Sequence, residues 1–212
     1  MTGALVLREV RRGLAGPAWL PVAFFLLVAT IVPFTVGPDA RLLARIGGGA
    51  LWIAALTAAL LPIDRLVEPD RVDGVLDQLA LTGVAEEAVG AAKMIGHWLT
   101  FGPLLLIAAV PASFLVGLDG PALERSLLAL AIGTPALAAL AVAVAALTAG
   151  LPRAGSLAGL LLMPLAVPLI IFGAAATGDG ESSALKLEAA VALLAVAGAP
   201  FVTGAAIRAS RT

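Results

Sequence analysis

The chain of 212 residues has no cysteine and only one histidine, His97. Without cysteine it can form no disulfide, no thiolate metal site and no thiol nucleophile. One histidine excludes a metal site built from several of them. A phosphate-binding G-x-x-x-x-G-K-[ST] loop needs glycine directly before lysine, whereas Lys93 and Lys186 follow alanine and leucine. We therefore expect no catalytic site, no metal site and no ATP-hydrolysing site in this chain.

Charge is also scarce. Charged residues make up 13% of the chain, hydrophobic residues 61%, and the mean hydropathy is +1.07. Soluble domains have roughly 25% charged and 45–50% apolar residues. The net charge of −1 offers no basic stripe for nucleic acid, so we expect no nucleic-acid partner. The excess of apolar residues predicts an integral membrane protein in contact with lipid.

Six apolar stretches are long enough for the roughly 20 residues that a helix needs to cross a bilayer. They are Trp19–Val36, Ile46–Ile63, Met94–Leu118, Ser126–Leu151, Ala154–Ala176 and Leu187–Ile207. Glu188 opens the last stretch, where we expect it at the membrane interface, and Pro164 and Pro168 predict a kinked or broken fifth helix. Abundant small residues favour close helix packing. The fold class is therefore all-α, one polytopic membrane domain over residues 1–212.

The basic residues predict the topology. Arg8, Arg11 and Arg12 precede the first apolar run, as in a signal peptide, but this run is long enough to span and others follow, so we expect an uncleaved helix. With the N-terminus in the cytoplasm, the inner side holds Arg8, Arg11, Arg12, Arg65, Arg71, Lys93, Arg153, Arg208 and Arg211, and the outer side Arg41, Arg45, Arg125 and Lys186. This excess favours two cytoplasmic termini.

Residues 3–15 have an amphipathic pattern. Leu7, Val10 and Leu14 share one helical face, and the three arginines fall largely on another. Such a helix can lie in the membrane interface with its basic face toward anionic headgroups. The alternative is a basic flank that only fixes the topology.

The segment 64–93, between the second and third spans, holds a second amphipathic helix. Pro69 suits a first helical turn, which also favours Asp70 and Asp73. An apolar face with i, i+3, i+4, i+7 spacing consists of Val72, Val75, Leu76 and Leu79. The residues left for a partner surface are Asp70, Arg71, Asp73, Gly74, Asp77 and Gln78. Such a helix fits the groove of a soluble partner; the alternative is an ordinary solvated loop helix.

Two further polar groups are candidate ligand contacts. His97 and Trp98 begin the third span, where they could contact haem iron or a partner, or could serve as an interfacial pair. Arg41 and Arg45, close to Asp39 on the first outer loop, could contact a propionate or a phosphate. Arginines in such places more often mark the membrane boundary.

Several ordered motifs resemble one family closely. They are FTVGPDARLLARIGGGALWIAALTAALLPIDRL, DGVLDQLAL, AAKMIGHW, GTPALA, MPLAVPLIIFGAA and PFVTGAAIR. From about residue 5 to residue 209 the chain is similar to haem exporter protein B of cytochrome c maturation, the permease subunit of an ATP-binding-cassette complex.

The resemblance implies a six-helix, exporter-type (ABC-2-like) permease of the bacterial inner membrane. Its partners would be a second copy of itself, two copies of an ATPase subunit that binds the ATP, a multi-span haem-handling protein with its one-span helper, and a periplasmic haem chaperone. The coupling helix of such permeases would correspond to Pro69–Leu81. The tryptophan-rich motif of the haem-handling partner is absent, so we expect no cofactor bound tightly here and haem only as a handled or transported ligand.

The implied function is to couple ATP hydrolysis on a separate chain to haem export or to release of the haem-loaded chaperone. Two alternatives remain at this stage. The chain could be a scaffold that recruits the other subunits without transporting, or a secondary carrier for a small apolar solute. The lack of charged pairs within the spans weighs against the carrier.

Overall fold

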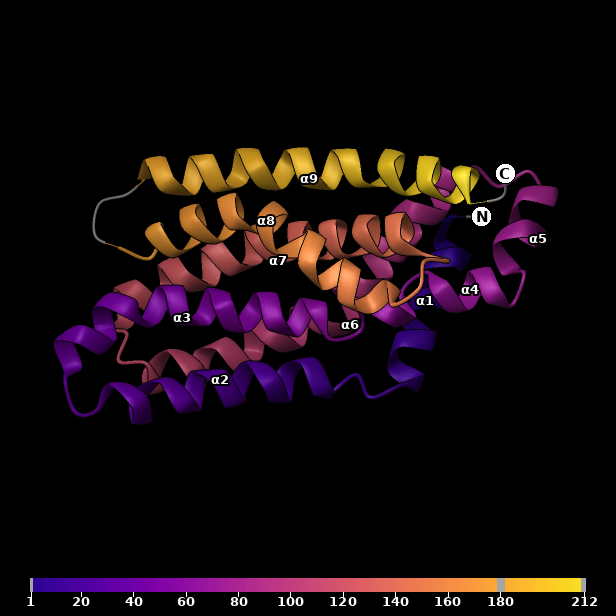
Figure 1. Ribbon diagram of the computed structural model, residues 1–212. Helices are drawn as coiled ribbons and strands as arrows, with labels where there is room; N and C mark the ends of the chain where they lie inside the picture. The colour runs from indigo at the N-terminus through magenta and orange to yellow at the C-terminus, as the bar shows by residue number, and fades with distance from the viewer. Residues whose placement is uncertain (1, 179–181, 211–212) are drawn as a thin grey trace.

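The computed structural model describes residues 2–178 and 182–210, and within them every regular element is helical (Figure 1). The elements are α1 (Thr2–Ala15), α2 (Leu20–Val36), α3 (Ala40–Leu60), the 3-10 turn η1 (Ile63–Arg65), α4 (Glu68–Val72), α5 (Val75–Leu81), α6 (Glu86–Leu115), α7 (Gly120–Thr148), α8 (Ala154–Ala175) and α9 (Ser182–Ala209). The expected all-α fold is confirmed.

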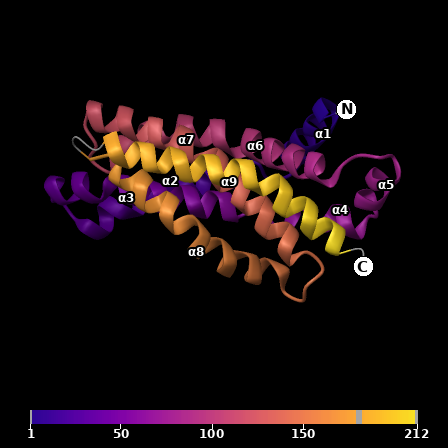
Figure 2. The ribbon, with the colours of Figure 1, turned by 90° about the horizontal axis from the view of Figure 1, so that it is seen from above.

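Five helices are individually long and apolar enough to cross a membrane: α3, α6, α7, α8 and α9. The sixth, α2, has 17 residues and qualifies only together with α1, from which it is bent by 60°. The bend follows from Gly16 and Pro17, which separate the two helices. We therefore treat α2 as the first span and α1 as a helix lying across the end of the bundle (Figure 2).

The long helices run side by side, and their connections alternate between two ends (Figure 1). One end carries both chain termini, α1, α4, α5 and the turn between α7 and α8; we call it the terminal end. The basic residues that we assigned to one side of the membrane gather there, apart from Arg211, which lies outside the described residues. The opposite end carries the α2–α3 and α6–α7 turns.

The centre of the bundle is made mostly of small residues. The helix α7 packs against α6, α8 and α9, and its buried face includes Ala136, Ala138, Ala139, Ala141 and Ala145. Alanine lets helix backbones approach closely, which increases dispersion contact where lipid supplies no hydrophobic driving force between helices. This agrees with the close packing that the composition predicted.

The expected spans are confirmed as helices, but their boundaries differ. The helix α3 begins before Ile46, because Asp39 caps it by accepting a hydrogen bond from the Leu42 amide at 3.0 Å. The helix α6 begins at Glu86, two turns before the expected Met94. The helix α8 continues through Pro164 and Pro168, so the predicted break does not occur.

Candidate functional site

The predicted coupling segment lies at the terminal end, but it is not one helix. It consists of α4 and α5, which are separated by Asp73 and Gly74. The Asp73 amide closes α4 by donating to the Pro69 carbonyl at 2.9 Å, and Gly74 adopts a left-handed φ of +70°. Glycine takes this conformation without the Cβ clash that other residues meet. The expectation of a continuous helix from Pro69 to Leu81 is therefore wrong.

The apolar face of this segment packs on the bundle only through α5. Leu76 is buried in a cluster with Ile63, Val67, Val89 and Ile207. Leu79 packs against the same cluster, and Val75 is half-buried.

Val72, by contrast, is 67% exposed. Its assignment to the packed face is wrong, because the break at Gly74 rotates α4 relative to α5.

The exposed residues of α4 and α5 form what we call the outer surface: Val72, Asp73, Asp77, Gln78 and Leu81. Leu81 is 88% exposed, the largest value among the exposed large apolar side chains of the described residues. Two carboxylates, an amide and two apolar side chains are therefore exposed on α4–α5, which lies at the terminal end (Figure 1). Exposed apolar side chains bordered by polar residues are a feature of protein-binding surfaces.

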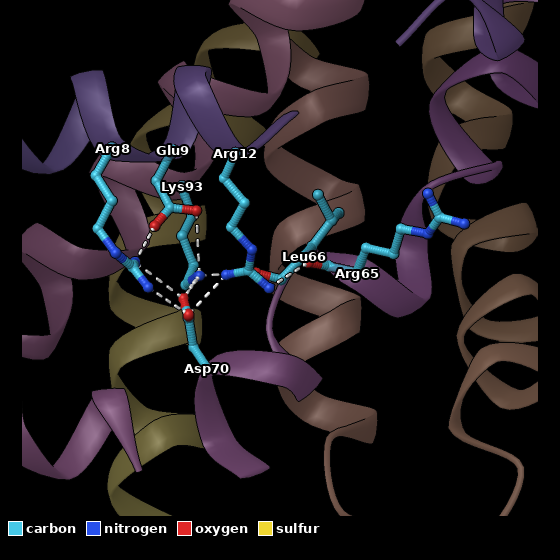
Figure 3. A network of polar contacts seen from close by, with 7 residues as sticks. All are labelled: Arg8, Glu9, Arg12, Arg65, Leu66, Asp70 and Lys93. Atoms are coloured by element: carbon cyan, nitrogen blue, oxygen red, sulfur yellow. Dashed lines mark hydrogen bonds and ion pairs between the residues drawn. The ribbon is translucent and has the colours of Figure 1, made fainter. Parts of the chain in front are cut away.

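Asp70, which we expected on this surface, points in the opposite direction and is buried (Figure 3). It belongs to a polar cluster with Arg8 and Arg12 of α1 and Lys93 of α6. The guanidinium groups of Arg8 and Arg12 each donate to Asp70 Oδ1 at 2.6 Å, and Lys93 Nζ donates to Oδ2. One carboxylate therefore ties α4 to both α1 and α6.

Glu9 completes this polar cluster. It lies 2.6 Å from Arg8 and 3.3 Å from Lys93. Lys93 Nζ also donates to the Leu66 carbonyl at 2.8 Å. A buried lysine is stable when all its donors are paired, and here each of the three donors has an acceptor.

Asp70 lies beyond the break that follows Leu60, outside the membrane-spanning part of α3. Burial alone would raise the pKa of its carboxyl. The hydrogen bonds from Arg8 and Lys93, together with the charges of Lys93 and Arg12, outweigh burial and lower the pKa of Asp70 to about 2. Asp70 is therefore ionised at physiological pH, and the polar cluster is a set of ion pairs.

A second contact ties α4 to the turn between α7 and α8. Arg71 donates to Glu68 at 2.6 Å, and Glu68 accepts from the Gly150 amide at 2.9 Å. The hydrogen bond from Arg71 lowers the pKa of Glu68 below its ordinary value. Arg71 thus pairs within α4, although we expected it on the partner surface.

His97 and Trp98 lie three turns inside α6 and face the protein interior. His97 is buried, with its ring 4.7 Å from that of Phe101. Trp98 Nε1 donates to Thr134 Oγ1 of α7 at 3.1 Å. Neither side chain is the exposed interfacial anchor that we expected, because both face neighbouring helices.

Arg41 and Arg45 lie in the first two turns of α3, at the opposite end from His97. We expected them on a loop, but the Asp39 cap extends the helix over them. The structure therefore does not bring the candidate arginines and the candidate histidine into one ligand site.

The sequence reasoning missed an enclosed carboxyl. Glu188 of α9, expected at the interface, has no exposed surface, and among the described residues its carboxylate oxygens have no hydrogen-bond partner. It lies beside Gly133 of α7, on which the ring of Trp52 from α3 also packs. The sequence feature that could have indicated this tightly packed region is the pair of glycines, Gly133 and Gly173, which accommodate the Trp52 ring.

Comparisons with known proteins agree with the resemblance seen in the sequence. The model of the CcmB protein family matches residues 3–210. Heme exporter protein B of Rhodobacter capsulatus is 45% identical over 216 residues, and that of Paracoccus denitrificans 42% over 212, each alignment covering 97% of both chains. Heme exporter protein B of Escherichia coli is 41% identical over 203 residues, covering 93% of this chain and 90% of the relative. The chain, a multi-pass membrane protein, belongs to the CcmB protein family.

Proposed function

We propose that this chain is the membrane permease subunit of an ATP-binding-cassette complex that exports haem or releases a haem-loaded chaperone during cytochrome c maturation. The ATPase is a separate subunit that binds the outer surface of α4 and α5. The proposal rests on family membership and on one structural observation: the segment with this exposed surface is tied to three other parts of the bundle.

The ties supply a route for mechanical coupling. On its exposed side, α4–α5 presents Asp73, Asp77 and Gln78. On its inner side, Asp70 holds α1 and α6, and Glu68 holds the α7–α8 turn. A displacement of α4 by a bound partner is therefore passed to several helices at once, as coupling between two packings of a bundle requires.

The remaining assignments follow from the family. Haem is the handled ligand, as the relatives' name states for them. The membrane is the bacterial inner membrane, with the terminal end in the cytoplasm, where ATP is available. A second copy of the chain and two ATPase subunits complete the core, and the haem-handling protein, its helper and the haem chaperone act with it.

The test is to purify the chain and two charge-reversal variants in mild detergent and to measure whether an ATPase co-purifies with each. Asp77→Lys places a cation on the outer surface, whereas the matched control Glu124→Lys makes the same change on an exposed residue of α7 near the opposite end. We expect Asp77→Lys to reduce the co-purified, vanadate-sensitive ATP hydrolysis at least tenfold, and Glu124→Lys to leave it unchanged. Normal ATPase association in Asp77→Lys would reject the assignment.

A variant that leaves the outer surface intact distinguishes a scaffold from a coupling subunit. Asp70→Asn weakens the tie of α4 to α1 and α6 without altering an exposed side chain. A coupling subunit with this change binds the ATPase but loses cytochrome c maturation. A scaffold that only recruits the ATPase retains both.

A further inference from the structure

A cavity of about 270 Å³ opens at the terminal end, where α1 meets the start of α2. Its walls come from α1, residues 16–18 of the bend, the start of α2, residues 61–66 around η1, α4 and α6. The cavity lies beside the polar cluster of Figure 3, which closes one side of it. The opposite wall is apolar and includes Leu20, Pro21, Leu61 and Phe101.

The cavity contains polar groups that the protein does not satisfy. His97 lines it and is 5% exposed, and within the described ranges its Nε2 has no hydrogen-bond partner. A buried imidazole nitrogen without a partner costs free energy unless a ligand or water pairs with it. This atom marks the inner part of the cavity as a place where a polar group of a ligand can pair with the protein.

Two arginines line the cavity, and their guanidinium groups point in different directions (Figure 3). Arg65 lines the cavity, and its side chain makes no hydrogen bond or ion pair to any residue that the structure describes. Arg12 donates to Asp70 and to the Arg65 carbonyl. Since a guanidinium has five N–H donors, Arg12 retains capacity for a further acceptor.

The charge of this region favours an anion. Arg8, Arg12, Lys93 and Arg65 carry four positive charges, against two negative charges on Glu9 and Asp70. The net charge of these six groups is therefore +2. The Arg65 guanidinium suits a phosphate, which arginine binds in a bidentate manner.

The position of the cavity indicates that the ligand also has a hydrocarbon part. Along α1 and the bend, Leu7, Leu14 and Trp19 are exposed apolar side chains beside basic ones, the pattern of a helix in the membrane interface. The opening therefore lies at headgroup depth. A ligand at this depth can place its anionic head at the arginines and its hydrocarbon along the apolar wall.

We propose that this cavity is a binding site for an anionic phospholipid. Arg65 holds the phosphate, Arg12 adds positive charge beside the cavity, His97 Nε2 accepts a hydrogen bond from a headgroup hydroxyl, and Leu20, Leu61 and Phe101 contact the acyl chain. By filling the space between α1 and α6, the lipid holds α1 against the bundle beside the polar cluster. The site is independent of whether an ATPase binds the outer surface.

The test is native mass spectrometry of the full chain in mild detergent, titrated with phosphatidylglycerol, phosphatidylcholine or inorganic phosphate. Arg65→Gln and His97→Phe alter the site, and Arg11→Gln is the matched control. Arg11 is an exposed arginine of α1 that does not line the cavity. An unfolding temperature equal to that of the wild-type chain establishes that a variant is folded. Because Arg65→Gln changes an exposed side chain, this variant keeps the test decisive if His97→Phe unfolds.

We expect phosphatidylglycerol to bind the wild-type chain more tightly than phosphatidylcholine does. Arg65→Gln and His97→Phe each weaken that binding about tenfold, equivalent to about 1.4 kcal/mol, whereas Arg11→Gln has no effect. An equal loss in Arg11→Gln would mean unspecific attraction to basic groups and would overturn the proposal. Equal binding of phosphatidylcholine, or of inorganic phosphate with no preference for the lipid, would overturn it too. Displacement of the lipid by haem at equal concentration would assign the cavity to the porphyrin instead.

Discussion

Replacing Asp70 with asparagine tests how strongly the polar cluster holds α4 to the bundle. In the wild-type chain three cations (Arg8, Arg12, Lys93) surround two carboxylates (Glu9, Asp70), a net charge of +1. Asp70→Asn raises this charge to +2 without changing the shape of the side chain. Lys93, which is almost fully buried, keeps Glu9 as its one anionic partner in the cluster, beside the neutral Leu66 carbonyl.

The size of the effect follows from the burial of each pair. Removing one partner of a buried ion pair costs about 3–5 kcal/mol. Arg8 and Arg12 are about one third exposed, so their pairs add little, and Lys93 retains two acceptors. We therefore expect the low end, about 3 kcal/mol. For a chain of this length that lowers the unfolding temperature by roughly 6–12 °C.

The assay is thermal unfolding in detergent, with Asp73→Asn as the matched control. Asp73 is exposed three residues further along, and its substitution should change stability by less than about 0.5 kcal/mol. Removing the excess positive charge as well, in Asp70→Asn with Lys93→Met, should recover part of the loss. Equal unfolding temperatures for Asp70→Asn and Asp73→Asn would refute the structural role assigned to the polar cluster.

Three further substitutions test other contacts by the same unfolding assay. Gly133→Ala would place a Cβ 2.0 Å from Trp52 Cη2 and should cost about 1–3 kcal/mol, whereas Gly198→Ala, with open space around it, should cost nothing; equal effects would contradict the packing. Glu188→Leu should leave the unfolding temperature unchanged or raise it, because the described residues give its carboxylate no partner, and a marked fall would show a missing contact. Gly74→Ala forces a left-handed alanine and should cost about 1 kcal/mol; no loss would mean that α4 and α5 can join into one helix.

Much of the fold could be predicted from the sequence because apolar run length is a strong signal. A bilayer requires about 20 apolar residues per helix, so the six stretches identified six helices. The boundaries were less accurate, because helices continue past the apolar run wherever a cap or polar partner supports them. Asp39 extends α3 over Arg41, and the paired Lys93 lies within α6.

The candidate site was predicted in place but not in orientation. Periodicity located an amphipathic segment after the second span, yet it could not show that Gly74 would adopt a left-handed conformation and rotate α4. Asp70 therefore faces inward and Val72 outward, the reverse of the expectation. The pairing of Asp70 with Lys93 and α1 also joins residues far apart in the chain, and periodicity carries no information on such contacts.

The most direct test of the central claim is site-specific cross-linking from the outer surface. Because the chain has no cysteine, a single cysteine at Gln78 can carry a photoactivatable cross-linker, with a cysteine at Glu124 as the control near the opposite end. The account predicts that membranes containing Gln78→Cys yield a cross-link to an ATP-hydrolysing protein and that Glu124→Cys does not. Cross-linking of that ATPase from Glu124 but not from Gln78 would contradict the assignment of α4 and α5 as the coupling segment.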